Sequence, residues 1–379
     1  MLTPNLLPAI LVAGPPHSGK SVLAYLLSQR LREAHVPHIL LRAAPDGEGD
    51  WFYQSDNEVR MHQRQKGVFT ADLIEDLMHA IHNRSLPMLV DIGGRPRESQ
   101  FRLFDACTHV IHLWRATEDH LEWTQWLNDR SLIPIASLRS QLAPPDSLEP
   151  GDGSLRGAIS GLERDHPQPG PTFDEVLTRV QGICTYPSGS LESEHLSRAP
   201  LNIPLLTLDQ LARDLGITRV NQKTWWNPED LPRLRELIPP GEPLALYGPG
   251  PVWLYAALAA HAAPAPFYLF DARHYGWMAP PPVILDADQT NEAFTLAVQM
   301  EDADVRLKFE RQQPHYVLKP QPVLVPSLPS NRRVILDGPM PIWLFAALAR
   351  GLCAQATLAT YEPRTRLSIT FWTQPARPL

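Results

Sequence analysis

Residues 14–21, Gly14-Pro15-Pro16-His17-Ser18-Gly19-Lys20-Ser21, decide the fold of the first part of this 379-residue chain. They fit the pattern G-x-x-x-x-G-K-[ST]. The pattern lies between the apolar run Ala9–Ala13 and a segment, 18–34, whose apolar residues recur at helical spacing. The sequence therefore predicts a strand, a phosphate-binding loop and a helix in that order.

Each residue of the pattern has a predicted role. The glycines let backbone N–H groups turn inward around phosphate oxygens, and the start of the helix adds partial positive charge. A lysine here reaches the β- and γ-phosphates, and the following hydroxyl holds Mg²⁺. We expect ATP with Mg²⁺ as the ligand, contacted by Gly14, Ser18, Gly19, Lys20 and Ser21.

Three further positions are candidates for the same site. Asp91 lies near the end of the apolar run Met88–Ile92, where an acid can orient the magnesium ion and act with Lys20 in catalysis. Arg95 and Arg97 follow, and either one of them contacts a transferring phosphoryl group or both face solvent. Asp46-Gly47-Glu48 comes after a second strand, where small-molecule kinases often hold the acceptor. A surface turn is the alternative there.

Strand-like and helix-like runs alternate over residues 1–140. This order predicts a parallel sheet with helices on both faces, as in an α/β P-loop NTPase domain. Residues 141–172 are rich in Pro, Gly, Ser and acids, and we expect a long loop or lid there. A helix over 173–183 would close this first domain, which we place at 1–200.

Composition limits the classes of function. Hydrophobic residues make up 44% and charged residues 20%, so a packed globule is expected. The net charge of −7 argues against coating long duplex nucleic acid but allows a small anionic ligand. Three well-separated cysteines, and a start without a basic region, predict a cytoplasmic protein without a signal peptide. The apolar stretch 252–270 contains prolines and indicates a buried helix and strand rather than a membrane span.

The second half contains an internal repeat. Residues 244–259 read LALYGPGPVWLYAALA and residues 334–349 read VILDGPMPIWLFAALA, with 10 of 16 positions identical. Each copy predicts a strand, a turn and a helix. The simplest account is two small α+β domains in tandem, at 201–287 and 288–379. The second domain begins with a predicted β-hairpin over 293–309.

The repeated turns are candidate anion sites. Gly248, Gly250 and Gly338 allow tight turns and a close approach of the backbone to a ligand. Free N–H groups at the helix start would then face the anion. Trp253 and Trp343 either stack on a base or belong to the helix core.

The run GPGPVWLYAALA at 248–259, followed by PFYLFDARHYGW at 266–277, resembles the CRISPR-associated ring nucleases of the third, manganese-dependent class. The resemblance covers about residues 200–379. The family also occurs fused behind a P-loop (AAA-type) domain, which matches the remainder. The resemblance implies that the protein binds and linearises cyclic tetraadenylate. In the family, this is done by small α+β domains that dimerise around the ring. The tandem copies would form that pair within one chain.

The resemblance also implies individual residue roles. The family uses an Asp-Pro-Arg motif with a histidine upstream, which carries over to Asp271 and Arg273, with His261 as the upstream histidine. Asp271 would hold Mn²⁺, and Arg273 would neutralise a phosphate. The second copy has Glu362 and Arg364 at the matching place, so we expect these two to contact the ring.

Three hypotheses remain open from the sequence. The first is a type III CRISPR ancillary protein that binds cyclic tetraadenylate, as a ring nuclease or without cleavage, and couples this to binding or hydrolysis of ATP. The second is a small-molecule or nucleotide kinase whose C-terminal repeats serve assembly or sensing. The third is a pure sensor, in which the ring gates the first domain. Independently of these hypotheses, we expect a homo-oligomer and no membrane contact.

Overall fold

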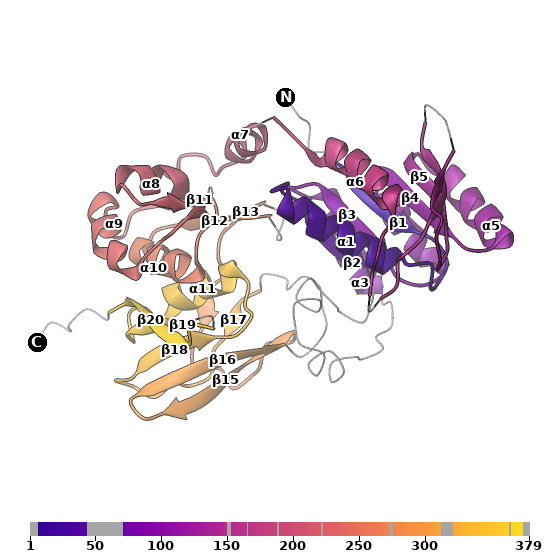
Figure 1. Ribbon diagram of the computed structural model, residues 1–379. Coiled ribbons are helices and arrows are strands. Elements are labelled where there is room, and N and C mark those ends of the chain that lie inside the picture. Colours follow the sequence, from indigo (N-terminus) through magenta and orange to yellow (C-terminus); the bar gives the residue numbers. More distant parts are fainter. Residues whose placement is uncertain are drawn as a thin grey trace, which may run out of the picture. The chain divides into compact units, whose positions relative to one another are not determined.

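The computed structural model (Figure 1) describes residues 7–43, 71–149, 153–164, 166–187, 189–220, 223–272, 276–311, 321–363 and 365–373. These residues form two compact units, one built from residues up to Glu194 and the other from His195 onward. Each unit is described by itself below. The predicted acceptor residues Asp46 and Glu48 lie outside the described residues, as do Arg273 and Arg364.

The first unit is a mixed α/β fold around a seven-stranded sheet. Its elements are β1 (Ala9–Ala13), α1 (Lys20–Glu33), β2 (Ile39–Ala43), α3 (Ala71–His82), β3 (Met88–Ile92), α4 (Phe101–Asp105), β4 (His109–Trp114), α5 (Thr117–Asn128), β5 (Ile133–Ser140), β6 (Ser147–Leu148), β7 (Leu155–Ile159) and α6 (Pro171–Cys184). The strand order is β2-β3-β1-β4-β5-β7-β6. All neighbours are parallel except β6 and β7. The carboxyl ends of six strands therefore share one edge.

Helices cover both faces of this sheet, as the sequence predicted (Figure 1). On one face, α1 and α6 pack on alternate residues of the central strands, including Ile10 and Ile111. The neighbouring side chain His112 points to the other face, where its ring stacks near Trp123 of α5. The apolar runs β1 and β3 are buried along their whole length, because both of their faces are covered.

The segment 141–172 differs from the predicted loop or lid. Residues Leu155–Ile159 pair in parallel with β5 and extend the main sheet, with the short β6 as its antiparallel edge. The connection is fixed by Asp146, whose carboxylate accepts hydrogen bonds from the Ser160 N–H at 2.8 Å and the Thr172 N–H at 3.1 Å. The surrounding Pro and Gly residues concealed this strand from sequence reasoning.

The second unit holds both copies of the repeat. Its elements are β8 (Leu205–Thr207), α8 (Leu208–Asp214), β9 (Arg219–Val220), β10 (Lys223–Thr224), α9 (Leu231–Leu237), β11 (Leu244–Tyr247), α10 (Val252–Ala262), β12 (Phe267–Asp271), β13 (Gly276–Met278), β14 (Val283–Ile284), β15 (Phe294–Glu301), β16 (Asp304–Arg311), β17 (Val323–Leu324), β18 (Arg333–Asp337), α11 (Ile342–Leu352), β19 (Leu358–Glu362) and β20 (Leu367–Trp372). Strands β13-β12-β11-β8 form one sheet, and β15-β16-β18-β19-β20 form another. The predicted hairpin is β15 and β16.

The two copies have the same strand pairing. In each, the strand before the Gly-Pro turn pairs in parallel with the strand after the helix, as Leu244 with Phe267 and Val334 with Leu358. In each, the next strand returns antiparallel. The strand β8 stands in the first copy where β16 stands in the second.

One continuous core joins the copies. Buried residues of α10 and α11 belong to the same apolar cluster. In addition, the Arg350 guanidinium of α11 donates to the carbonyl oxygens of Ala259 at 3.2 Å and Ala265 at 2.8 Å. The copies are therefore packed as one body, with a shared interior.

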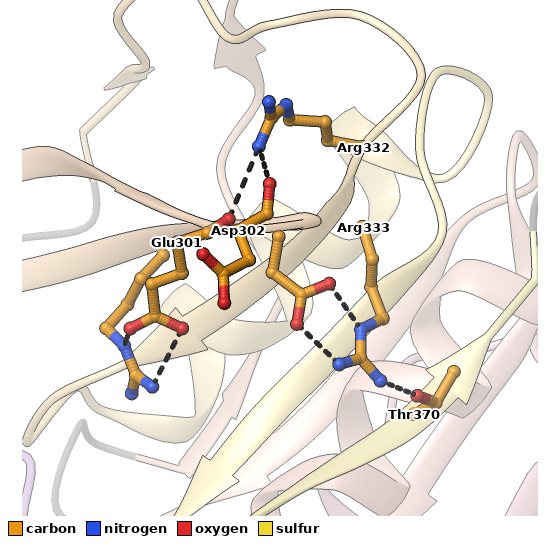
Figure 2. Close-up of polar contacts among 7 residues, drawn as sticks. Glu301, Asp302, Arg332, Arg333 and Thr370 are labelled. Carbon is orange, nitrogen blue, oxygen red and sulfur yellow. Dashed lines mark hydrogen bonds and ion pairs between the residues drawn. The ribbon is translucent and has the colours of Figure 1, made fainter.

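Charged side chains fasten one end of the five-stranded sheet, as Figure 2 shows. Arg333 of β18 makes a two-point contact with Asp304 of β16, at 3.0 and 2.5 Å, and donates to the Thr370 hydroxyl of β20. Arg332 donates to the backbone carbonyls of Glu301 and Asp302. The Arg333 hydrogen bond lowers the pKa of the Asp304 carboxyl. These contacts fix the register of three strands.

Among the described residues, no helix is both long and apolar enough to cross a lipid bilayer.

Candidate functional site

The loop between β1 and α1 has the backbone that its glycines permit. Gly14 has φ +144° and Gly19 has φ +84°, both in the region that L side chains rarely adopt. A Cβ on Gly14 would lie 2.0 Å from the carbonyl oxygen of Leu113 at the end of β4. The loop therefore rests directly on β4, and α1 begins at Lys20 with Gly19 as its N-cap.

Lys20 is buried inside this loop. Its ammonium donates to the Pro15 carbonyl oxygen at 2.7 Å. Burial lowers the pKa of Lys20 from 10.5 to about 8, and the charge of Asp91 offsets part of that effect. The loop therefore holds a cation close to a carboxylate in a place of limited solvent access.

Asp91 lies where the sequence placed it, near the carboxyl end of β3. Its neighbours across the sheet are Val12 of β1 and Arg42 of β2. The Arg42 Nε lies 4.0 Å from an Asp91 carboxylate oxygen, and both side chains are largely buried. The structure thus brings Lys20, Asp91 and Arg42 together at one edge of the sheet.

Arg42 was missed by sequence reasoning, although a signal was present. A charged residue in the otherwise apolar run Ile39–Ala43 is unexpected in a covered strand. A charge buried there needs a partner, and the neighbouring strand supplies Asp91.

The remaining loop residues have distinct surroundings. Ser18 is fully buried, and its hydroxyl has no hydrogen-bond partner among the described residues. Ser21 is half-buried in the first turn of α1, next to Lys20. A buried hydroxyl without a hydrogen-bond partner lowers the stability of the folded state, so a purely structural role does not explain it.

The predicted magnesium ligands fit the chemistry of that ion. Within the described part of the chain, no group of three or more His, Cys, Asp or Glu side chains could hold a metal ion. Mg²⁺ normally takes only one or two protein oxygens and completes its shell with water and phosphate. The Ser21 hydroxyl and the Asp91 carboxylate are a sufficient donor set of that kind.

Arg95 is engaged elsewhere in the unit. Its guanidinium pairs with Glu122 of α5 and lies over the ring of Trp126, 5.5 Å from the centroid. Both partners belong to α5, so these contacts do not support the predicted phosphate contact.

In the second unit, the turn glycines are explained by packing. Gly248 has φ +115° and faces Leu208, while a Cβ on Gly250 would lie 2.5 Å from the Leu208 side chain. Gly338 has φ +113°, and a Cβ there would meet the Phe309 carbonyl oxygen at 2.9 Å. These glycines therefore allow the turn backbone to pack closely against the start of α8 in the first copy and against β16 in the second.

The two tryptophans belong to the core. Trp253 is 3% exposed and Trp343 is 0% exposed, and both are members of the shared apolar cluster. Neither ring has a face open to a base, so the expectation that they contact a cyclic oligonucleotide is corrected here. In α10 every residue from Trp253 to Ala262 is buried, so the tryptophan is part of a fully enclosed helix.

Asp271 lies at the carboxyl end of β12, near the first Gly-Pro turn. Its charge acts on Tyr255, whose pKa is raised mainly by burial and further by Asp271 and Tyr247. The Tyr255 hydroxyl donates to the Gly248 carbonyl. The structure therefore groups Asp271, Tyr255 and the turn at Gly248. In the second copy Phe345 replaces Tyr255, so that hydroxyl is absent there.

His261 is not brought to Asp271. It lies in the last turn of α10, where its Nε2 contacts the Ile238 carbonyl oxygen at 2.7 Å. Because α10 runs back across the sheet, its end lies at the opposite edge from the carboxyl end of β12. The contact with Ile238 instead fastens α10 to the segment that precedes β11.

A different histidine lies beside β12, where it packs on Phe270. His195 is buried, its ring centroid is 4.3 Å from that of Phe270, and its Nδ1 contacts the Tyr247 hydroxyl at 2.9 Å. The Trp277 Nε1 donates to the His195 carbonyl at 2.7 Å. Sequence reasoning missed His195, because it lies 76 positions before Asp271 and carries no motif.

The second copy has an ionic arrangement at the matching turn. Arg306 donates to Asp337, just before Gly338, at 3.0 Å and lies over the Tyr361 ring at 4.7 Å. Glu362 ends β19, as Asp271 ends β12. The turns are therefore alike in backbone but different in side-chain chemistry.

One family model matches part of the sequence. The model of the family described as CRISPR-associated protein (Cas_csx3) matches residues 313–373, which include β18, α11 and β19 of the second copy. The match supports a CRISPR-associated protein. No curated protein matches the sequence.

Among solved structures, chloroplast FtsY from Physcomitrella patens is similar at 11% sequence identity with a TM-score of 0.25. The similarity covers 46% of this chain and 65% of that chain, slightly under two thirds of its length.

Proposed function

We propose that this protein is a CRISPR-associated nucleotide-binding protein with two ligands. The first unit binds ATP with Mg²⁺ at the loop over residues 14–21. The second binds cyclic tetraadenylate beside its Gly-Pro turns. The observation that carries the first part is the meeting of buried Lys20 with Asp91 beneath the loop. A lysine held this way is preorganised to meet the terminal phosphates of a nucleotide.

Ser21 and Asp91 would hold the magnesium ion, which would supply charge neutralisation to the bound phosphates. Lys20 would leave the Pro15 carbonyl and donate to phosphate oxygen instead. The buried Ser18 hydroxyl, which has no hydrogen-bond partner among the described residues, would gain a phosphate oxygen as its partner.

Calorimetric titration with ATP and Mg²⁺ tests this part. Lys20→Met should reduce affinity by more than a hundredfold, because the only cation inside the loop is lost. Arg30→Met, an exposed cation on the same helix that pairs with Glu33, is the matched control and should bind normally. Equal affinity of wild type and Lys20→Met would refute the assignment.

The proposal for the second unit is supported by three observations. They are the shared pairing of the two copies, the grouping of Asp271 with the first turn, and the family match over the second copy. We propose that Asp271, with Mn²⁺ as cofactor and Arg273 as anion contact, serves cleavage of the ring. Glu362 and Arg364 would bind the same ligand from the second copy.

The test is incubation with cyclic tetraadenylate and Mn²⁺, followed by chromatography of the products. Asp271→Asn should slow cleavage far more than it weakens binding, whereas Glu362→Gln should mainly weaken binding. Asp214→Asn, an exposed acid at the end of α8, is the control. An intact ring together with no measurable binding would remove this part of the proposal.

Arg42 favours a second candidate, a small-molecule or nucleotide kinase. This cation beside Asp91 would stand at the end of the site that receives the terminal phosphoryl group, where it would neutralise an incoming phosphorylated acceptor. A screen for ADP release over nucleotides and phosphorylated metabolites tests it. Turnover that depends on one metabolite and is abolished by Arg42→Met would support the kinase.

A further inference from the structure

A cavity of about 570 Å³ opens beside the loop in the first unit. Its walls come from three segments that are far apart in the sequence. The loop contributes Pro16. The segment between β4 and α5 contributes Arg115 and Ala116, and the first turn of α5 contributes Asp119. The end of β5 and the residue after it contribute Arg139, Ser140 and Gln141. The hollow is open to solvent on one side, and its volume is within the range of small-ligand sites.

The strand order places this cavity on a definite side of the loop. In the order β3-β1-β4-β5, Asp91 lies at the end of β3, on one side of the loop that follows β1. The cavity lies at the ends of β4 and β5, on the other side. If the terminal phosphates lie over Lys20 and Asp91, the rest of the nucleotide extends toward the cavity.

The side chains of the cavity suit a nucleoside. Arg115 and Arg139 carry planar guanidinium groups, which stack on aromatic bases. The Asp119 carboxylate can accept hydrogen bonds from ribose hydroxyls or from an exocyclic amine.

One of the arginines is held in position by its neighbours. The Arg139 guanidinium donates to the Gln141 amide oxygen at 3.1 Å, and the Gln141 amide nitrogen donates to the Pro145 carbonyl at 2.7 Å. A cation fixed by such a chain loses less freedom when it contacts a ligand. On these grounds we propose that the cavity holds the nucleoside of the nucleotide whose phosphates bind residues 14–21.

This inference rests on the proposed nucleotide binding, and the experiment must separate the two. We would titrate wild type, Arg115→Gln and Arg139→Gln with ATP–Mg²⁺ and, in parallel, with inorganic tripolyphosphate–Mg²⁺. Arg102→Gln, an exposed arginine paired with Glu75 outside the cavity, is the control. Both cavity arginines are exposed, so the variants should remain folded, and their unfolding midpoints would verify this.

We expect each cavity variant to lose about tenfold in ATP affinity, the equivalent of one charged contact, with tripolyphosphate affinity changed less than twofold. Wild type should bind ATP more tightly than tripolyphosphate. Equal affinity for the two ligands, or cavity variants that bind ATP like wild type, would overturn the nucleoside site while nucleotide binding stands. Failure of wild type to bind either ligand would overturn both.

Discussion

The state of one lysine links the fold of the first unit to its proposed ligand. The pKa of Lys20 falls from 10.5 to about 8, chiefly because burial disfavours the charged form. Its unfolded state therefore binds more protons between pH 8 and 10.5, so this group makes the unit more stable as pH rises through that window. Below pH 8 the full cost of the buried charge is present.

The corresponding prediction concerns Lys20→Met. The variant should be more stable than wild type at pH 7.5, and the difference should shrink toward pH 10. Urea unfolding of both proteins at the two pH values measures it, and the comparison cancels other titrating groups. A difference that is constant with pH would show that Lys20 has an ordinary pKa.

A second prediction at this scale concerns Gly14. Its Cβ would overlap the Leu113 carbonyl oxygen, and its φ of +144° strains any other residue. Gly14→Ala should therefore cost more than about 3 kcal/mol of the free energy of unfolding and abolish ATP binding.

Gly94→Ala is the control for this prediction. Gly94 has φ +74°, but its Cβ would meet nothing within 4 Å, so only backbone strain of about 1 kcal/mol applies. Equal costs for the two substitutions, measured by denaturant unfolding, would contradict the close contact between the loop and β4.

At the scale of elements, the contact of Arg333 with Asp304 and Thr370 joins β16, β18 and β20. Arg333→Gln should cost about 1 kcal/mol, because a two-point contact within a partly buried network exceeds a simple surface pair. The loss should diminish as pH falls through the lowered pKa of Asp304, since the protonated acid no longer attracts Arg333.

Arg219→Gln breaks a more exposed pair with Asp209 and should cost less than about 0.5 kcal/mol. Chemical unfolding at neutral pH compares the two variants. A smaller cost for Arg333→Gln than for Arg219→Gln would contradict the role assigned to the network.

The sequence predicted the elements whose periodicity or capping is local. The strands β1, β3 and β4 are short apolar runs, α1 follows a recognisable loop, and the hairpin of β15 and β16 has a polar turn between two alternating runs. The strand β7 was missed, because its five residues are stabilised by pairing with β5 and by the Asp146 contacts, which are not local.

The candidate site followed the same division. Lys20, Ser21 and Asp91 could be predicted because a motif and a strand end fix their places. Arg42 had a signal, its charge in an apolar run, but only the folded sheet identifies Asp91 as its partner. His195 had none, because only the fold brings it to Phe270. The role of the two tryptophans was ambiguous in the sequence. A large aromatic side chain at the start of a helix is compatible both with stacking on a ligand at the turn and with packing in the core.

At the scale of the whole molecule, the two units have separate apolar cores, whereas the two copies of the repeat share one. We therefore expect two unfolding transitions in calorimetry rather than one or three. Gly182→Ala, at an exposed site of α6 with nothing near its Cβ, should raise the transition of the first unit by stabilising the helix by about 0.5–1 kcal/mol.

Tyr255→Phe should lower only the other transition, because it removes the buried hydrogen bond to the Gly248 carbonyl, at about 1 kcal/mol. A shift of both transitions by either substitution would contradict the assignment of separate cores.

The most direct test of the whole account is native mass spectrometry of the full chain with ATP–Mg²⁺ and cyclic tetraadenylate together. Wild type should carry both masses on one chain, and Lys20→Met should lose ATP while it keeps the ring or its linear product. Wild type that carries neither mass, or a Lys20→Met protein that still carries ATP, would contradict the assignment of one nucleotide to each unit.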